Sequence, residues 1–253
     1  MRVAVIVVVS VAVLMSVRAT AYAADLIHLP GIKGQDDRQL IRTTDYPWST
    51  IGRVNRTTGG FCTGTVIGPR TVLTAAHCLW NKRTRNWLPP SALHFVAGYQ
   101  KGDYVVASRV ASITVNNDFR YLKKPGIADL ANDWATLTLT KDIETQTGSL
   151  SLSRTPLSVT LSGNEKLIQA GYSQDKPHIL SAHDGCQVRR TEAGGRVFVH
   201  NCDAVKGDSG SPLIVRQVGR STYRLVGIHV ATRVLETGSD QGIAVSSIGM
   251  KGL

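Results

Sequence analysis

The chain has 253 residues, and its 29 Lys and Arg residues outnumber its 18 Asp and Glu residues, so the formal net charge is +11. A basic chain can bind nucleic acid, but these basic residues are scattered and lack interleaved aromatic side chains, which argues against such a partner. The sequence has no internal repeat and no low-complexity tail, and it predicts a globular protein rather than a solenoid.

The first 23 residues have the pattern of a secretory signal peptide. Arg2 precedes an apolar run over 3–17, and the segment 21–23 offers small residues for cleavage before Ala24. The run is shorter than the ~20 apolar residues that a membrane-spanning helix needs, so an uncleaved anchor is the weaker alternative. We therefore expect residues 1–23 to be removed and the protein to be secreted or periplasmic.

The rest of the sequence suits one folded domain. We interpret residues 24–31 as a short pro-segment and residues 32–253 as the functional domain. No later stretch is long and apolar enough to span a bilayer, so we expect no membrane association after the signal is removed. We also expect a monomer.

Short runs of β-branched and apolar residues recur between Gly, Pro and Asn residues, and this pattern predicts antiparallel β-structure. The pattern alone does not choose between a sandwich and a barrel. Apolar alternation fades over 142–158, and we place there the boundary between lobe 1, about 50–145, and lobe 2, about 155–253. The predicted strands are 65–67, 71–73, 104–106, 112–115, 135–139, 197–199, 213–215 and 225–228.

Two segments far apart in the sequence carry the residues of a nucleophilic hydrolase. Ser209 stands in a glycine-rich hexapeptide, 207–212, and His77 stands in the segment 74–78. A serine hydroxyl is a poor nucleophile at neutral pH unless a base removes its proton. An imidazole titrates near the working pH, so His77 can take that proton and later return it to the leaving group.

Neighbouring residues complete the chemistry. Gly207 and Gly210 flank the serine because a tight turn must expose its hydroxyl. The backbone N–H groups of Gly207 and Ser209 would then donate to the carbonyl oxygen that becomes negative. Asp133, which precedes an alternating strand, would accept the other imidazole N–H and fix the tautomer, and we prefer it to the nearby Asp129.

The chain order His77, Asp133, Ser209 resembles that of the trypsin/chymotrypsin-like serine peptidases. The segments 34–38 and 46–48 further resemble the N-terminal pattern of a bacterial branch that contains the glutamyl endopeptidases. The resemblance implies an all-β fold of two antiparallel six-stranded β-barrels with the active site in the cleft between them. It also implies an endopeptidase that cleaves protein or peptide substrates through an acyl-enzyme, without a cofactor.

An even number of cysteines in an exported protein favours disulfides over metal thiolates, and four cysteines allow three pairings. The resemblance implies the pairs Cys62–Cys78, beside the histidine, and Cys186–Cys202. No group of His, Asp and Glu residues has the spacing of zinc ligands, so we expect no metal site.

Asp208 matches a carboxylate that, in the trypsin branch, pairs with an α-amino group released from a zymogen, because a buried charge without a partner is costly. Ile32 is the corresponding N-terminus by position. Gly31 precedes it rather than Arg or Lys, so a tryptic activation cut is not indicated.

The residues expected to set substrate preference point in opposite directions. The resemblance assigns Asp203 to a pocket floor that binds substrate Arg or Lys, and it assigns His229 to the recognition of a substrate carboxylate. Thr232 offers a hydroxyl for an acidic substrate, whereas Ala204 lacks one. Charge complementarity leads us to expect a preference for Arg or Lys, with Glu as the alternative. A second alternative is a catalytically silent binding protein, although such proteins usually lose a triad residue.

Overall fold

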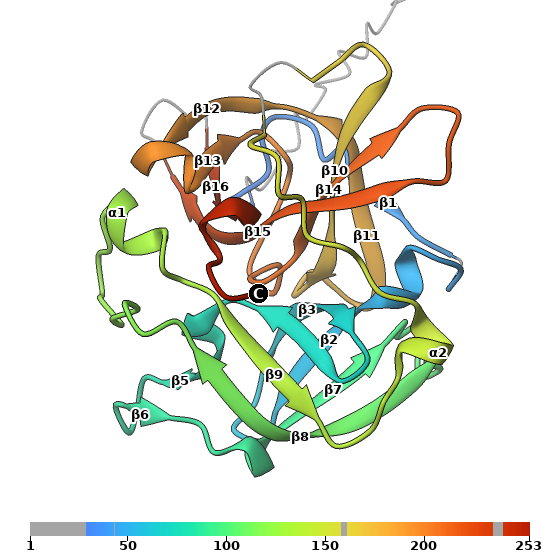
Figure 1. Ribbon diagram of the computed structural model, residues 1–253. Helices are drawn as coiled ribbons and strands as arrows, with labels where there is room; N and C mark the ends of the chain where they lie inside the picture. The colour runs from blue at the N-terminus through green and yellow to red at the C-terminus, as the bar shows by residue number, and fades with distance from the viewer. Residues whose placement is uncertain (1–28, 43, 158–160, 235–239) are drawn as a thin grey trace, which may run out of the picture.

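The computed structural model describes residues 29–42, 44–157, 161–234 and 240–253. The predicted signal peptide and most of the predicted pro-segment lie outside these described residues. Two β-rich lobes are stacked, one built from the first half of the chain and the other from the second half, as the colours of Figure 1 show. The segment that precedes the first lobe in sequence lies against the second lobe.

The first lobe is a closed barrel of six strands in the order β2-β3-β4-β9-β8-β7. All neighbouring strands are antiparallel. Thr74 on β4 pairs with Ala135 on β9, so the ends of these two strands lie side by side. The strands are β2 (Ile51–Arg56), β3 (Phe61–Gly68), β4 (Thr71–Thr74), β7 (Leu93–Ala97), β8 (Val106–Val115) and β9 (Ala135–Leu139).

Of the predicted strand 104–106 only Val106 lies in a strand, β8, which also contains the whole of the predicted strand 112–115. The sequence pattern did not reveal β2 or β7. In β2, glycine and polar residues interrupt the β-branched pattern, but Gly52 has a packing role: a Cβ atom there would lie 2.5 Å from the Phe95 ring of β7. Close approach of the two strands therefore requires the glycine that obscured the pattern.

The second lobe is an eight-stranded sheet in the order β1-β11-β10-β14-β15-β16-β13-β12. Only Gln187 separates β11 from β12, so these two strands are consecutive parts of one bent segment that lie toward opposite ends of the sheet. β1 is added at one edge from the N-terminal segment. Without β1, and with β11 and β12 taken as one bent strand, the lobe has the six strands expected. The strands are β1 (Gln39–Leu40), β10 (Glu165–Ser173), β11 (Lys176–Cys186), β12 (Val188–Glu192), β13 (Val197–His200), β14 (Pro212–Gln217), β15 (Tyr223–Arg233) and β16 (Gln241–Ser246).

Within the described part of the chain, no helix has the length and apolar character that crossing a bilayer requires. The elements outside the two large sheets are all short. They are the hairpin strands β5 (Trp80–Asn81) and β6 (Asn86–Trp87), the helices α1 (Ile127–Leu130) and α2 (Glu144–Thr147), and the 3₁₀ turns η1 (Trp48–Thr50), η2 (Ala76–Leu79), η3 (Pro90–Ala92), η4 (Ala193–Gly195) and η5 (Ser247–Gly249).

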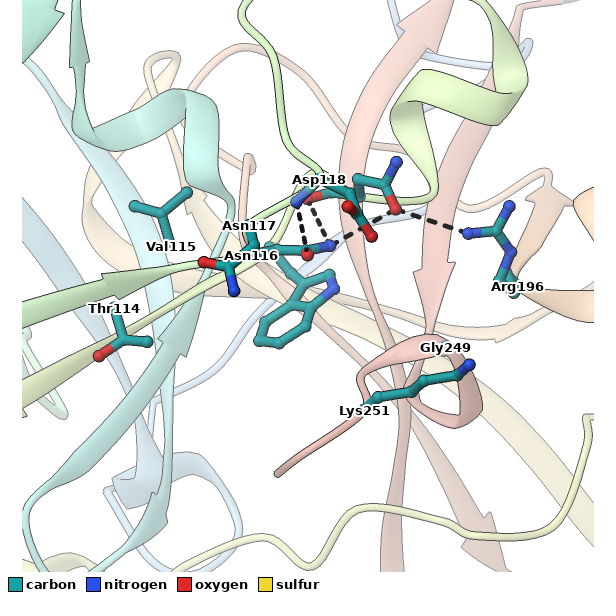
Figure 2. Close-up of a pocket in the computed structure, with 10 residues that line it drawn as sticks. Thr114, Val115, Asn116, Asn117, Asp118, Arg196, Gly249 and Lys251 are labelled. Carbon is teal, nitrogen blue, oxygen red and sulfur yellow. Dashed lines mark hydrogen bonds between the residues drawn. The ribbon is translucent and has the colours of Figure 1, made fainter.

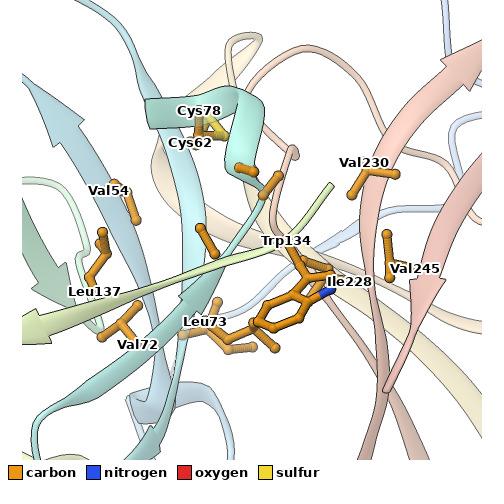
Figure 3. Close-up of a cluster of buried hydrophobic side chains, with 14 of the residues drawn as sticks. Val54, Cys62, Val72, Leu73, Cys78, Trp134, Leu137, Ile228, Val230 and Val245 are labelled. Carbon is orange, nitrogen blue, oxygen red and sulfur yellow. A yellow bond between two sulfur atoms is a disulfide. The ribbon is translucent and has the colours of Figure 1, made fainter. Parts of the chain in front are cut away.

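One buried hydrophobic cluster extends through both lobes (Figure 3). It includes Val54 and Leu137 from the first barrel and Ile228 and Val245 from the second sheet, all 0% exposed. Burial of about 25 cal/mol per Å² of apolar surface makes such a shared core the main force that holds the lobes together. The loops between the lobes are thereby held in fixed relative positions.

Candidate active site

Two paired strands of the first barrel place His77 and Asp133. β4 ends at Thr74 and leads into η2, which carries His77, and Asp133 lies two residues before β9. Because β4 and β9 are paired at these ends, both side chains reach the same edge of the barrel. Asp133 Oδ2 lies 2.6 Å from His77 Nδ1, and Asp133 Oδ1 accepts a 2.9 Å hydrogen bond from the His77 amide. These two contacts fix the orientation of the imidazole.

Ser209 reaches this pair from the second lobe. Its Oγ lies 2.9 Å from His77 Nε2, on the opposite side of the ring from the carboxylate. Backbone hydrogen bonds hold the serine between the lobes: Thr63 N donates to Ser209 O at 2.9 Å, and Gly210 N donates to His229 O at 2.7 Å. With Nδ1 donating to the carboxylate, Nε2 is left to accept the serine proton.

The two glycines beside the serine are required by the backbone. Gly207 and Gly210 have φ values of 105° and 84°, in the left-handed region that favours glycine. A Cβ on Gly210 would also lie 2.2 Å from Thr63 O. Within the described part of the chain, the N–H groups of Gly207 and Ser209 donate no hydrogen bond. Both are therefore free to donate to an oxygen bound beside the serine hydroxyl.

The triad is exposed on one side only. The His77 side chain is 26% exposed, whereas that of Asp133 is 4% exposed. Figure 2 shows a hollow whose lining includes Asn132 and Trp134, the neighbours of Asp133 in sequence, and there Asn116 Nδ2 donates to Asn132 O at 3.2 Å. Arg196, which precedes β13 in the second lobe, lies with Nη1 3.5 Å from Asn132 Oδ1. The residue before Asp133 is thus in contact with both lobes.

Asp203, which the resemblance assigned to the pocket floor, lies against the N-terminal segment. This residue is 0% exposed, and its carboxylate faces the N-terminal segment rather than an open pocket. Its oxygens accept hydrogen bonds from Lys33 N at 2.7 Å and Asp37 N at 2.9 Å. Burial alone would raise the pKa of Asp203, but a hydrogen bond from His183 and these two amides outweigh it and lower the pKa. A carboxylate with these partners is satisfied without a substrate cation.

The fold brings together one group of metal-ligand residue types that sequence spacing did not indicate. The ligand atoms of Asp37, His183 and Asp203 lie within 4.8 Å of one another. His183 Nδ1 lies 3.2 Å from Asp203 Oδ2, and the backbone amides described above bind the same carboxylate. We therefore interpret the group as part of the polar contact between the N-terminal segment and the second lobe.

His229 lies at the other side of the serine and is paired with a second buried histidine, His200, which the sequence did not single out. His200 Nε2 and His229 Nδ1 are 3.2 Å apart. Since His200 Nδ1 accepts from Cys202 N at 3.2 Å, His200 carries its proton on Nε2 and donates it to His229. Burial, with the charges of Lys33 and His77, lowers the pKa of His229 to about 3. His229 is therefore neutral at pH 7 and carries its own proton on Nε2.

The N-terminal segment forms a wall beside Thr232, one of the predicted pocket residues. Thr232 Oγ1 donates to Ala204 O at 3.3 Å, and Ala204 N donates to Gly31 O at 3.1 Å. The Lys33 ammonium donates to Gly31 O at 2.7 Å and to Cys202 O at 2.6 Å. Burial lowers the pKa of Lys33 to about 8, although nearby carboxylates oppose the shift. This lysine is the pocket-side residue that sequence reasoning missed.

Asp208 has partners within the second lobe. Its carboxylate accepts hydrogen bonds from Ser173 Oγ and from Val205 N, each at 2.9 Å. Burial raises the pKa of Asp208 to about 6. Arg38, whose side chain is 1% exposed, donates from Nη1 to Ser173 Oγ at 3.0 Å and also forms salt bridges with Asp36 and Asp175. The Ser173 hydroxyl therefore links the Arg38 guanidinium to the carboxylate of Asp208, the residue before Ser209.

Both implied disulfides are present. Cys62–Cys78 joins β3 to the turn that carries His77, and Cys186–Cys202 joins the end of β11 to the segment before Asp203. Each closes a sequence separation of 16 residues and would contribute about 3 kcal/mol by restricting the unfolded chain.

The two-lobed fold and the hydrogen-bonded Ser-His-Asp group define a serine peptidase scaffold. Comparison with protein families matches the Trypsin family over residues 38–249. Because this match covers most of the chain, the chain belongs to the trypsin family of serine endopeptidases.

Two relatives refine this placement. A glutamyl endopeptidase of Bacillus licheniformis is 41% identical over 54 residues, which is 21% of this chain and 17% of that protein, so the match spans a small part of the relative's length. A solved structure of a Glu endopeptidase in complex with MPD has a TM-score of 0.68 at 21% identity and covers 85% of this chain and 93% of that one. This similarity confirms the expected trypsin-like fold.

Proposed function

We propose that this protein hydrolyses peptide bonds through an acyl-enzyme on Ser209. The observation that carries the proposal is the continuous hydrogen-bonded chain from Asp133 through His77 to Ser209 Oγ. His77 takes the hydroxyl proton as the serine attacks the carbonyl carbon, and it returns the proton to the leaving amine. Water then enters by the same route and releases the acyl group.

The N–H groups of Gly207 and Ser209 bind the oxyanion that forms during attack. Their lack of other acceptors among the described residues supports this role. Removal of one such donor typically costs about 3 kcal/mol of transition-state stabilisation.

For the residue before the cleaved bond, the geometry supports an acidic side chain, and we infer a preference for Glu. The Asp203 carboxylate is engaged by backbone amides, which removes the basis for Arg or Lys. His229, which is 3% exposed, instead carries a neutral Nε2–H with no acceptor among the described residues, and the Lys33 ammonium is close enough to influence its pKa. A donor and a nearby positive charge suit a carboxylate. Both named relatives are glutamyl or Glu endopeptidases.

We further infer export by the N-terminal signal, processing near Ile32 and function as a monomer. Processing there would remove the 3.0 Å turn bond from the Ile32 amide to Leu29 O and the bonds that Gly31 O accepts from Ala204 N and Lys33 Nζ, but no strand pairing. N-terminal sequencing of active protein tests this, since a uniform start at Ala24 with full activity would exclude processing.

A digest of unfolded proteins tests the activity and the preference together. Purified protein and a Ser209→Ala variant are incubated with the mixture, and mass spectrometry reads the residue before each new cut. We expect cuts after Glu that are absent from the variant. Cuts after Arg or Lys would reassign Asp203 to the pocket, and no cuts from a folded, processed sample would favour a silent binding scaffold.

A further inference from the structure

A hollow of about 650 Å³ lies on the outer face of the first barrel, over β2, β3 and β7. Its lining includes Arg53, Arg56 and His94 together with the aromatic rings of Phe61 and Tyr99. None of the described residues that line it is acidic. The volume is in the range of small-molecule and side-chain sites, and its charge is positive.

Aromatic stacking holds Arg53 in this hollow. Its guanidinium carbon lies 4.0 Å from the centre of the Phe61 ring and 5.0 Å from that of Tyr99. Nη1 donates to Pro177 O at 3.0 Å, whereas the buried Nε has no hydrogen-bond partner among the described residues. Burial lowers the pKa of Arg53. The guanidinium is therefore oriented before any ligand binds, and it lacks an anionic partner.

Arg56 likewise has a guanidinium nitrogen without a hydrogen-bond partner among the described residues. Its Nη2 lies over Gly60, where an added Cβ would approach it to 2.7 Å, and its buried Nε has no partner within the described part of the chain. Burial lowers the pKa of Arg56, and no carboxylate opposes the shift. The acidic residue nearest to the lining in sequence, Asp103, is exposed and is held by backbone hydrogen bonds to Gln100. Two half-buried guanidiniums without a carboxylate favour the binding of an anion.

The hollow adjoins the candidate active site through Phe61. A Cβ on Gly207 would lie 3.0 Å from Phe61 Cε2, so the ring that stacks on Arg53 also contacts the oxyanion segment. The serine segment itself is bonded to β3 through Ser209 O and to β15 through Gly210 N. If the residue before the cleaved bond binds on the β15 side, at His229, the residues after the bond leave toward β3 and the hollow.

We propose that this hollow binds an acidic side chain of the polypeptide substrate on the C-terminal side of the cleaved bond, an assignment that rests on the proposed peptidase function. A carboxylate there would accept hydrogen bonds from guanidinium groups in the planar geometry that arginine favours. Arg53 and Arg56 would then act as residues of substrate binding outside the triad.

A peptide series tests the site. All peptides carry Glu before the cleaved bond, and each carries either Glu or Gln at one of the following positions. We expect Glu to raise kcat/KM about tenfold at one position only, as one charge-assisted hydrogen bond in a partly buried site predicts. Arg56→Gln, which leaves the Arg53–Phe61 stack in place, should reduce this ratio toward one. Arg83→Gln, an exposed control in the β5–β6 turn, should retain it.

Equal rates for Glu and Gln at every position would overturn the proposal. An equal increase at all positions that persists in Arg56→Gln would also overturn it, because general attraction by the +11 chain explains that result. Failure of the peptidase function looks different, since no peptide is then cleaved. In that case, calorimetry measures peptide binding to the Ser209→Ala variant and to the same variant with Arg56→Gln added. Weaker affinity of the double variant for the acidic peptide supports the binding site, and unchanged affinity overturns it.

Discussion

The two lobes hold their parts of the candidate active site in different ways. In the first barrel, His77 and Asp133 lie at the ends of β4 and β9, which are adjacent and paired, so ladder hydrogen bonds position both residues. In the second lobe, Ser209 and its neighbours lie on loops between strands. Those loops are supported by a segment from the other end of the chain.

The supporting segment contributes three kinds of contact. The amides of Lys33 and Asp37 bind the Asp203 carboxylate, Arg38 reaches Asp208 through Ser173, and β1 pairs with β11. A loop has few ladder hydrogen bonds of its own, so its conformation depends on such distant partners. We therefore expect the conformation around Ser209 to be sensitive to substitutions far away in sequence. The conformation around His77 and Asp133 should not be.

The largest effect should come from the triad, where the two lobes act as one unit. His77→Ala and Ser209→Ala should each lower kcat at least ~10⁴-fold, and the double variant should be no worse, because proton transfer needs both groups. Steady-state kinetics on a Glu-containing peptide measures this. Ser221→Ala, an exposed serine, is the control and should retain wild-type kinetics. Additive losses would mean that the two residues act independently.

Arg38→Met should destabilise the second lobe more than the first. It removes a buried guanidinium and leaves Asp36 and Asp175 with Lys176 as their remaining ion-pair partner, which should lower the free energy of unfolding by about 2 kcal/mol. Urea unfolding measures the loss, and hydrogen exchange locates it. We expect faster exchange in β10 and β11 than in β4 and β9.

The control for this prediction is Arg42→Met, which changes an exposed arginine in the same segment. It should leave both the unfolding free energy and the exchange pattern as in the parent. Equal loss of protection in both lobes of Arg38→Met would contradict the comparison, because it would make the N-terminal segment a support for the whole molecule.

His229→Ala should change substrate preference while the triad stays intact. Loss of the Nε2–H donor should lower kcat/KM for a peptide with Glu before the bond about 30-fold, as expected for one hydrogen bond to a charged group. The matching Gln peptide should be affected much less. Competition between the two peptides in one reaction measures the ratio directly.

Asp203→Asn sharpens the same test, because the amides of Lys33 and Asp37 already bind this carboxylate. We expect the preference between acidic and basic residues to be unchanged in this variant. A loss of cleavage after Arg or Lys would show that the carboxylate does reach the substrate.

The smallest effect concerns pH and the carboxylate beside the nucleophile. Burial raises the pKa of Asp208 from 3.8 to about 6 in the folded protein, so the folded state binds more protons than the unfolded state between these values. This group therefore makes the unfolding free energy fall as pH rises through that window, by at most about 1.4 kcal/mol per pH unit. Asp208→Asn should remove the slope in urea unfolding experiments, with Asp118→Asn, an exposed aspartate, as the control.

The Arg38–Asp36 pair gives the unfolding free energy the opposite dependence on pH, and it does so at lower pH. Measurements on Asp208→Asn isolate this contribution, because that variant lacks the slope due to Asp208. The hydrogen bond from Arg38 holds the pKa of Asp36 well below its ordinary value, so the stability from that pair is present at neutral pH and is lost as the carboxylate is protonated in acid. An unfolding free energy that does not change with pH in either direction would contradict both assignments.

The residues of the candidate triad could be proposed from the sequence because their short local patterns, in this chain order, resemble those of trypsin-like peptidases. His77 follows a β-branched strand, Asp133 precedes one, and Ser209 stands between glycines whose positive φ values require them. The all-β class was predictable for the same reason. The individual strands were less predictable, because β2 contains a glycine that its packing against Phe95 requires and because a break at Gln187 divides one bent strand into β11 and β12.

Substrate preference was not predictable, since it depends on the direction in which side chains point. The resemblance assigned Asp203 to the pocket, but two amides from the N-terminal segment bind its carboxylate. His200, which sets the tautomer of His229, gave no sequence signal because its role exists only when β13 and β15 both flank β16.

The sequence by itself determined the identity of the reacting groups, the β-structure and the local turns, because these depend on residue type and on neighbours within a few positions. Only the tertiary structure decided which carboxylates are already hydrogen-bonded, which imidazole nitrogen carries a proton and which arginines have no carboxylate partner among the described residues. These properties depend on groups that are distant in sequence, from 29 residues for His200 and His229 to 170 for Lys33 and Asp203. Local pattern carries no information about such pairs, since burial and hydrogen bonding are set by whatever the fold brings alongside.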